Sequence, residues 1–211
     1  MSGRDHGPVR LTDLLAVPAV TGHPTLVRPD DVGGRAAWDV LVRDGVLEVL
    51  RGDAAVAAGT GVAPHTRAGT LAAAVPAGAV VAGRTAAWVH DGTAVHDARL
   101  LDLTYLPGRN PPRSGGASGL VWQAPLLRDD VVALGGVRVT APARTAVDLA
   151  LRLDPDEALA LVLALVRSCA VDLSLARRLL ERRVRAVGRP RARLVLDRAA
   201  RALGAAGGAL P

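Results

Sequence analysis

The chain has 211 residues, a length that suits one or two domains. Half of the residues are hydrophobic, which excludes disorder throughout, and only 2% are aromatic, too few for base-stacking platforms that bind single-stranded nucleic acid. The formal charge is +6, and all 26 basic residues are arginine. A chain without lysine, isoleucine or phenylalanine is typical of a GC-rich bacterial genome, so arginine content alone does not indicate bidentate recognition.

The positive charge is concentrated at one end of the chain. Residues 1–166 carry 15 arginines and 17 acidic residues, a net charge of −2, whereas residues 167–211 carry 11 arginines and 3 acidic residues, a net charge of +8. The single cysteine, Cys169, excludes an internal disulfide. The longest apolar run, Ala158–Val166, is shorter than the roughly 18 residues that span a bilayer. We therefore expect a cytoplasmic protein with no membrane partner.

Residues 1–62 are predicted to form a winged helix-turn-helix domain. Leucines at helical spacing predict a helix over 10–16, and Trp38, Leu41 and Val42 share one face of a second helix that opens after Gly33-Gly34. An Arg-Gly-Asp turn between two short alternating runs then predicts a hairpin. The order helix, turn, helix, hairpin is that of a winged helix.

A winged helix contacts DNA through its second helix and its wing. On that interpretation the candidate DNA contacts of this domain are Arg35, Arg43 and Arg51. Three cations are few, and the six acidic residues between positions 30 and 53 would repel phosphate. The other interpretation is a winged helix that serves for protein contacts or structural support.

Residues 63–153 are predicted to form a small mixed α/β domain. Short apolar runs bounded by glycine and proline predict strands at 79–82, 99–105, 120–123, 131–134 and 137–139. Helical patterns occur at 66–75, 84–90 and from Thr140, a candidate N-cap, to about Leu153. The glycine- and proline-rich stretch 110–119 is predicted to be a loop.

Residues 154–211 are predicted to be an Arg-rich helical segment that packs on the α/β domain. Asp154-Pro155 starts a helix that is apolar nearly all round as far as Val166 and is expected to be buried. Asp172 is expected to cap the next helix, and a last helix is predicted over about 190–203, with a tail from Gly204. The fold class is thus α+β.

Arginines of the last two helices are expected to lie on outer faces: Arg177, Arg178, Arg182, Arg183, Arg185, Arg189, Arg191, Arg193, Arg198 and Arg201. A surface of this charge suits phosphate backbones or an acidic protein partner. We therefore add Arg178, Arg182 and Arg185 to the candidate DNA contacts. A solvated face in an arginine-biased proteome would give the same pattern.

The search for catalytic motifs is mostly negative. A phosphate loop ending in lysine and a His-Glu-x-x-His zinc helix are both missing from the sequence. His90, Asp91, His96 and Asp97 would bind a divalent metal if the turn at Gly92 brought them together; otherwise they form a polar loop. We expect no cofactor and no enzymatic activity.

Two stretches resemble a known family. Residues 79–89 read Ala-Val-Val-Ala-Gly-Arg-Thr-Ala-Ala-Trp-Val, and residues 137–150 read Val-Arg-Val-Thr-Ala-Pro-Ala-Arg-Thr-Ala-Val-Asp-Leu-Ala. Together with Leu126–Val132 between them, they resemble, in this order, the actinobacterial AbiEi-like antitoxins of type IV toxin–antitoxin systems. The residues that match the family pattern are Arg84, Thr85, Trp88, Pro142, Arg144, Thr145 and Asp148.

The resemblance implies an N-terminal winged helix-turn-helix that binds operator DNA and represses its own operon. It also implies a C-terminal domain that counters a nucleotidyltransferase-type toxin without stable contact. The matching residues are expected to shape the domain core rather than to act in catalysis. Gly83 departs from the family pattern, in which histidine is common at this position. The endonuclease-like extension of many relatives is expected to be missing.

Three functions remain open at this point. The first is an antitoxin and autoregulator with operator DNA as its partner, in which a homodimer would add weak contacts together. The second is a protein-interaction module whose winged helix is degenerate and whose arginine face docks an acidic partner. The third, and least favoured, is a metal-dependent hydrolase or nuclease that uses the His-Asp pairs.

Overall fold

The computed structural model describes residues 26–92, 100–109 and 119–207. Its elements are η1 (Pro29–Val32), α2 (Arg35–Arg43), β1 (Leu47–Arg51), β2 (Ala54–Ala57), α3 (Pro64–Gly69), β3 (Val80–Val81), α4 (Gly83–Asp91), β4 (Leu103–Tyr105), β5 (Val121–Gln123), η2 (Arg128–Asp130), β6 (Val131–Leu134), β7 (Val137–Thr140), α5 (Pro142–Arg152), α6 (Pro155–Cys169), α7 (Leu173–Glu181) and α8 (Arg189–Gly207). The fold is mixed α and β.

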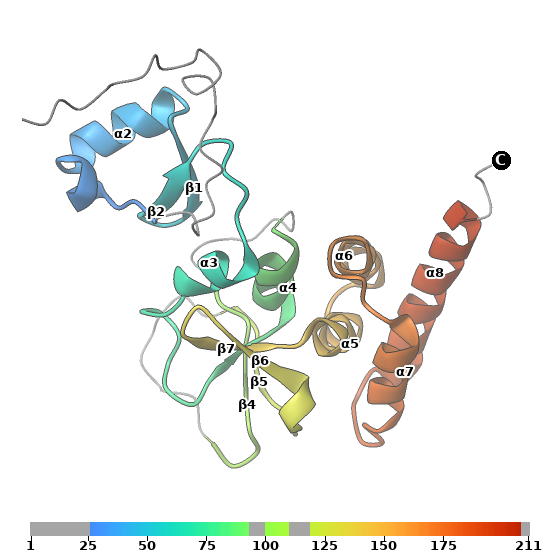
Figure 1. Cartoon of the computed structure of the whole chain (residues 1–211). Helices are drawn as coiled ribbons and strands as arrows, with labels where there is room; N and C mark the ends of the chain where they lie inside the picture. Colours follow the sequence, from blue (N-terminus) through green and yellow to red (C-terminus); the bar gives the residue numbers. More distant parts are fainter. Residues whose placement is uncertain (1–25, 93–99, 110–118, 208–211) are drawn as a thin grey trace, which may run out of the picture.

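The first described unit is a helix on a small hairpin. Strands β1 and β2 pair antiparallel, and Val27 forms a bridge to Ala55 on the other side of β2. Trp38 of α2 is buried against Leu47 and Ala55, so this unit has its own hydrophobic cluster (Figure 1). The helix and hairpin agree with the prediction for residues 33–58, whereas the predicted helix at 10–16 lies outside the described residues.

The larger unit is built on a five-stranded sheet with the order β5-β4-β3-β7-β6. The central strands β3 and β7 are parallel, with Val81 opposite Val139, and each runs directly into a helix, α4 and α5 respectively. Strands β4 and β6 are antiparallel to these two central strands. The helices pack beside the sheet and one hydrophobic core extends from Ala68 to Ala199, with α7 and α8 farthest from the sheet (Figure 1).

Local sequence signals account for most helix ends. The carboxylates of Asp154 and Asp172 accept hydrogen bonds from the backbone N–H groups of Asp156 and Ser174, which confirms the predicted helix start at Asp154 and the predicted cap at Asp172. Thr140 does not cap α5, because its hydroxyl lies 2.7 Å from that of Thr145 and the N-cap residue is Ala141. The prediction that a tail begins at Gly204 is wrong, since α8 continues through Gly204 to Gly207.

Two expectations about helix burial need correction. Helix α6 was expected to be buried nearly all round, but its fully buried residues are Ala158, Val162 and Leu165. Helices α4, α5 and α8 pack against part of its circumference, and its other apolar residues remain partly exposed. The helix predicted over 66–75 is instead α3, Pro64–Gly69, and the chain continues as turns in which Leu71 is still buried in the core.

Candidate functional site

Neighbouring carboxylates hold two of the three candidate DNA contacts of the first unit, Arg35 and Arg43. The Arg35 guanidinium donates to Asp39 at 3.0 Å and to Asp53 at 2.7 Å, which joins α2 to the hairpin turn. Arg43 donates to Asp44 at 3.1 Å. The side chain of Arg51 is half-buried, and this desolvation lowers the pKa of its guanidinium. Residues 26–62 together carry four arginines and six acidic residues, a net charge of −2.

Asp102 organises the start of α4. Its carboxylate accepts hydrogen bonds from the backbone N–H groups of Arg84 (2.8 Å) and Leu120 (2.7 Å), and its own N–H donates to the Thr85 hydroxyl. A Cβ at position 83 would lie 2.5 Å from this carboxylate, and the backbone there has φ +54°. Glycine at position 83 is therefore required by the close approach of Asp102 and by the positive φ.

Arg84 extends from this point toward α6. Its guanidinium donates two hydrogen bonds to Glu157, at 2.6 and 2.8 Å, and this pairing raises its pKa. Both side chains are about one-third to two-fifths exposed, so the pair is a partly solvated link between α4 and α6. Neighbouring Thr85 is fully buried and Trp88 nearly so.

A buried charge cluster lies at the start of α5. The side chain of Arg144 is 0% exposed and donates to Asp148 at 3.0 Å and to Asp130 at 2.7 Å. Its Nη1 also donates to the Pro125 carbonyl oxygen at 3.1 Å. Complete burial raises the pKa of Asp148, and the charge of Arg144 opposes this effect. A buried pair of this kind fixes geometry, because neither charge can lose its partner without a large penalty.

Arg183 reaches the same cluster from the other side. Its side chain is only 16% exposed, and its nitrogens lie 3.6 Å from Asp130 and 3.6 Å from Asp148. The expectation that Arg183 lies on an outer helix face is therefore wrong. Helix α7 ends at Glu181, so Arg182, Arg183 and Arg185 belong to the connector before α8 and not to a helix face. Both Arg182 and Arg185 are exposed.

Most other arginines of the last helices are paired within the chain. Glu181 accepts hydrogen bonds from Arg189 and Arg193, each at 2.6 Å. The remaining pairs are Arg177 with Asp197, Arg178 with Asp172, and Arg198 with Asp156. The Arg191 guanidinium donates to the Leu151 carbonyl oxygen. The positive surface is thus smaller than the sequence predicted, since a carboxylate neutralises many of its members.

The candidate metal residues are only partly described. His90 is buried, its Nε2 lies 2.7 Å from the Thr140 carbonyl oxygen, and burial lowers the pKa of the imidazole. Asp91 is half-buried, and His96 and Asp97 lie outside the described residues. Within the described ranges no three histidine, cysteine or acidic side chains gather in a way that would hold a metal ion.

Sequence reasoning missed Arg67. Its guanidinium is buried and donates to the carbonyl oxygens of Val89, His90 and Val62. It therefore occupies the C-terminal end of α4, where a positive charge is favourable, and holds the segment that leads from the hairpin. The approach of Arg67 to Gly92, where a Cβ would lie 2.6 Å from its Nη1, leaves no room for a side chain.

The seven family-pattern residues gather around the two units in which a central strand runs into a helix. Arg84, Thr85 and Trp88 lie on α4, and the other four lie on α5. Of these, Thr85, Arg144, Thr145 and Asp148 are fully buried, Trp88 is nearly so, and Pro142 is half-buried in the first turn of α5.

No helix in the described part of the chain is long and apolar enough to cross a membrane.

Comparisons with known proteins agree with this arrangement. The model of the AbiEi antitoxin C-terminal domain matches residues 76–198, more than half of the chain. The match begins before β3, includes both strand–helix units and ends within α8. A comparison with proteins of curated function gives no match.

Among solved structures, the RV2827C protein from Mycobacterium tuberculosis is similar. It is 19% identical, with 82% of this chain and 72% of that chain covered and a TM-score of 0.43. The family assignment depends on the domain match alone. The matched domain contains the sheet, the buried Arg144 cluster and both recognised sequence stretches. Because the match covers more than half of the chain, the chain belongs to the AbiEi antitoxin family of toxin–antitoxin systems.

Proposed function

We propose that this protein is the antitoxin of a type IV system that represses its own operon and counters a nucleotidyltransferase-type toxin. The observation that carries the proposal is the antitoxin-domain match over residues 76–198. The proposed division has a winged helix-turn-helix over residues 1–62, an α/β domain over 63–153 and an Arg-rich helical segment over 154–211. In this division the first domain binds operator DNA and the rest acts against the toxin.

The ion pairs of Arg35 and Arg43 do not prevent contact with DNA. The side chains of these three pairs are 52–72% exposed. Exposed ion pairs contribute about 1 kcal/mol or less, so a phosphate can replace the carboxylate at little cost. Each such exchange would add one salt-sensitive contact, and the acidic residues nearby would keep the affinity of a single domain low.

The DNA half of the proposal is tested by a gel shift with the DNA upstream of the gene. We expect salt-sensitive binding of this DNA by the full chain. The double variant Arg35→Ala/Arg43→Ala should bind every DNA sequence more weakly than the wild type does. For this variant the slope of log K against log salt concentration should be shallower by about two, since each lost phosphate contact reduces this slope by roughly one. Arg138→Ala, an exposed arginine on β7, is the matched control and should leave binding unchanged.

The toxin half is tested by co-expression with a nucleotidyltransferase-type toxin encoded next to this protein. We expect the wild type to restore growth, and Arg35→Ala/Arg43→Ala to restore it equally, because the substituted residues lie outside the matched domain. Loss of rescue in this variant would contradict the division of labour. No binding of upstream DNA at physiological ionic strength would refute autoregulation, and no rescue by the wild type would refute antagonism.

A second candidate function is a protein-interaction module. The net charge of −2 over residues 26–62 favours it, because a DNA-reading unit is usually basic. In that case the first unit serves as a structural support and exposed arginines such as Arg182 and Arg185 dock an acidic partner.

A further inference from the structure

A pocket of about 690 Å³ opens between the sheet edge and the connector that joins α7 to α8. Its walls come from the segment after β5, the end of α5, the end of α7 and the connector itself, residues 182–187. Small-molecule sites in proteins have volumes of about 300–1,000 Å³ and are lined mostly by apolar groups with a few convergent polar ones. This pocket has both properties.

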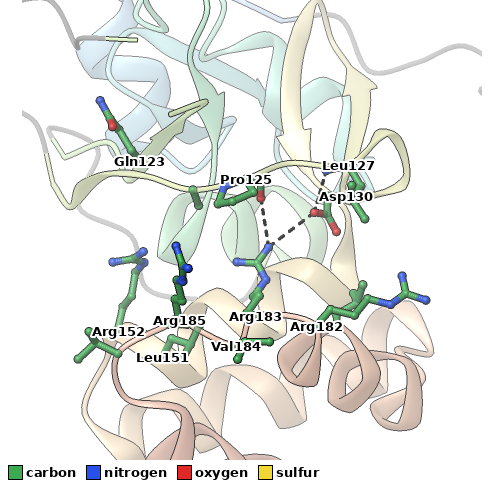
Figure 2. A pocket seen from close by; sticks show the side chains of 14 residues that line it. Gln123, Pro125, Leu127, Asp130, Leu151, Arg152, Arg182, Arg183, Val184 and Arg185 are labelled. Carbon is green, nitrogen blue, oxygen red and sulfur yellow. Dashed lines mark hydrogen bonds and ion pairs between the residues drawn. The ribbon is translucent and has the colours of Figure 1, made fainter. Parts of the chain in front are cut away.

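The lining is strongly positive. It contains Arg152, Arg182, Arg183 and Arg185 and a single acidic residue, Asp130, so its formal charge is +3. Asp130 is already bound to Arg144 at 2.7 Å. Figure 2 shows Arg152, Arg185 and Arg183 extending side by side toward the segment that carries Gln123 and Pro125, while Arg182 points away to one side. Asp130 and Asp148 lie 3.6 Å from Arg183, and the charge of Asp148 also acts on Arg152. The four arginines still outnumber these two carboxylates, so the cations repel each other and an anion would relieve this repulsion.

Three of these arginines have no ion pair in the part of the chain that the structure describes. Arg152 lies over the ring of Trp122, at 4.1 Å from its centroid, and the charge of Asp148 acts on it without a direct ion pair. Arg182 and Arg185 are exposed, and no carboxylate of the described residues pairs with them. This contrasts with α7 and α8, where Arg177, Arg178, Arg189, Arg193 and Arg198 are all paired. The pocket therefore combines one arginine that is paired, Arg183, with three that no carboxylate of the described residues pairs.

Arg183 is held loosely for a side chain that is mostly buried. Its contacts with Asp130, Asp148 and the Pro125 carbonyl oxygen are 3.6, 3.6 and 3.5 Å long. Charge-assisted hydrogen bonds are typically about 2.7–2.9 Å. Figure 2 marks the contacts with Pro125 and Asp130 by dashed lines. Because these contacts are long, the guanidinium keeps donors for a shorter bond to an anion in the pocket.

The remaining walls are apolar and partly uncovered. Leu127, Val184 and Val187 line the pocket and are 58%, 75% and 93% exposed, respectively. Large apolar side chains this exposed in one concave patch indicate a surface that a ligand covers. A ligand with an apolar body would bury them and fix the connector against the sheet.

We propose that this pocket binds a phosphorylated small molecule, with the phosphate on Arg152, Arg183 and Arg185 and an apolar or aromatic body against Leu127, Val184 and Val187. Phosphate suits the site better than a carboxylate, because its higher charge and additional oxygens match several planar guanidinium forks. The concave shape favours a small molecule over a duplex backbone, which requires protruding cations.

The test is calorimetric titration of the full chain with AMP, ATP, pyrophosphate and adenosine at physiological salt. We expect one saturable site that binds pyrophosphate, binds AMP and ATP more tightly than pyrophosphate, and does not bind adenosine. Arg185→Ala and Arg152→Ala should each weaken ATP binding about tenfold, the equivalent of one lost charge-assisted hydrogen bond. Arg201→Ala, an exposed arginine on α8 outside the pocket, is the matched control and should bind like the wild type.

Thermal unfolding gives a second measurement. ATP should raise the melting temperature of the wild type and of Arg201→Ala, and should raise that of Arg185→Ala less. Arg185 is exposed and has no ion pair among the described residues, so its removal should leave the fold intact.

Three results would overturn the proposal. One is no saturable binding of pyrophosphate, AMP or ATP, and another is equal binding of ATP by wild type and Arg185→Ala. The third is competition in which upstream duplex DNA displaces ATP with the same dependence on Arg185, which would assign these arginines to a DNA backbone. None of these depends on Arg35 or Arg43, so the outcome is separate from that of the operator-binding test.

Discussion

The two Arg-Thr pairs at the starts of α4 and α5 are chemically alike and energetically different. Arg84 and Arg144 each follow a central strand and each bind carboxylates, but Arg84 is 35% exposed at its side chain and Arg144 is 0% exposed. The Thr85 hydroxyl accepts from the Asp102 N–H, whereas the Thr145 hydroxyl donates to the Thr140 carbonyl oxygen. Burial, and not residue type, decides which arginine the fold depends on.

We predict that Asp148→Ala destabilises the protein by about 3–5 kcal/mol, because it leaves Arg144 buried without its closest partner on α5. Glu157→Ala, which removes the exposed partner of Arg84, is the matched comparison and should cost about 1 kcal/mol or less. Urea unfolding followed by circular dichroism measures both. The assignment of Arg144 as the structural arginine would be wrong if the two variants lost equal stability.

At the scale of elements, α7 and α8 are joined by charge as well as by apolar packing. Leu180 of α7 and Val195, Leu196 and Ala199 of α8 belong to the common core. On their outer side Glu181 bridges Arg189 and Arg193, and these arginines hold the pKa of Glu181 at about 2, below its ordinary 4.5. The link is present at neutral pH and is removed by acid.

This gives a pH-dependent prediction. A carboxyl group whose pKa is lower in the folded state stabilises the fold above its unfolded pKa, and the contribution disappears as pH falls through the folded pKa. The melting temperature of the wild type should therefore be higher than that of Glu181→Gln at pH 7. This difference in melting temperature should shrink between pH 4.5 and pH 2. Because the pair is exposed, high salt at pH 7 should also reduce the difference. A difference constant from pH 7 to pH 2 would contradict the assignment.

At the scale of the molecule, the positive charge lies at the opposite end of the chain from the helix and hairpin. The helix and hairpin before residue 63 have a small hydrophobic cluster of their own and a net charge of −2, whereas residues 167–211 carry +8. Arg67 connects the two parts by donating to Val62 and to the end of α4. If this antitoxin binds DNA, much of its favourable field comes from the end of the chain remote from the proposed reading helix.

We predict that Arg178→Glu/Arg182→Glu/Arg185→Glu separates the two candidate functions. If these arginines hold phosphates, affinity for duplex DNA falls uniformly across sequences and the salt slope becomes shallower. If they dock an acidic protein, toxin antagonism or a pulled-down partner is lost while DNA affinity is unchanged. Arg138→Glu is the control for a general effect of added negative charge.

Short-range signals in the sequence predicted much of the local structure. Asp154 and Asp172 fixed the starts of α6 and α7 through their own caps, and glycine and proline correctly bounded the strands at 131–134 and 137–139. The two Arg-Thr stretches predicted the family, which the domain match confirms. Each of these depends on residues a few positions apart.

Contacts between distant residues were decided by the tertiary structure alone. Nothing local in the sequence indicates that Arg183 turns inward to Asp130 and Asp148, that Arg35 is bound by Asp53, or that Asp102 requires glycine at position 83. The domain boundaries and the DNA contacts remain predictions. The sequence determined which segments are helices or strands, and which family they form, because caps, turns and apolar periodicity act within a few residues. Only the folded chain decided which arginines are neutralised and which line a pocket, because a charge is paired by whatever carboxylate lies nearby in space.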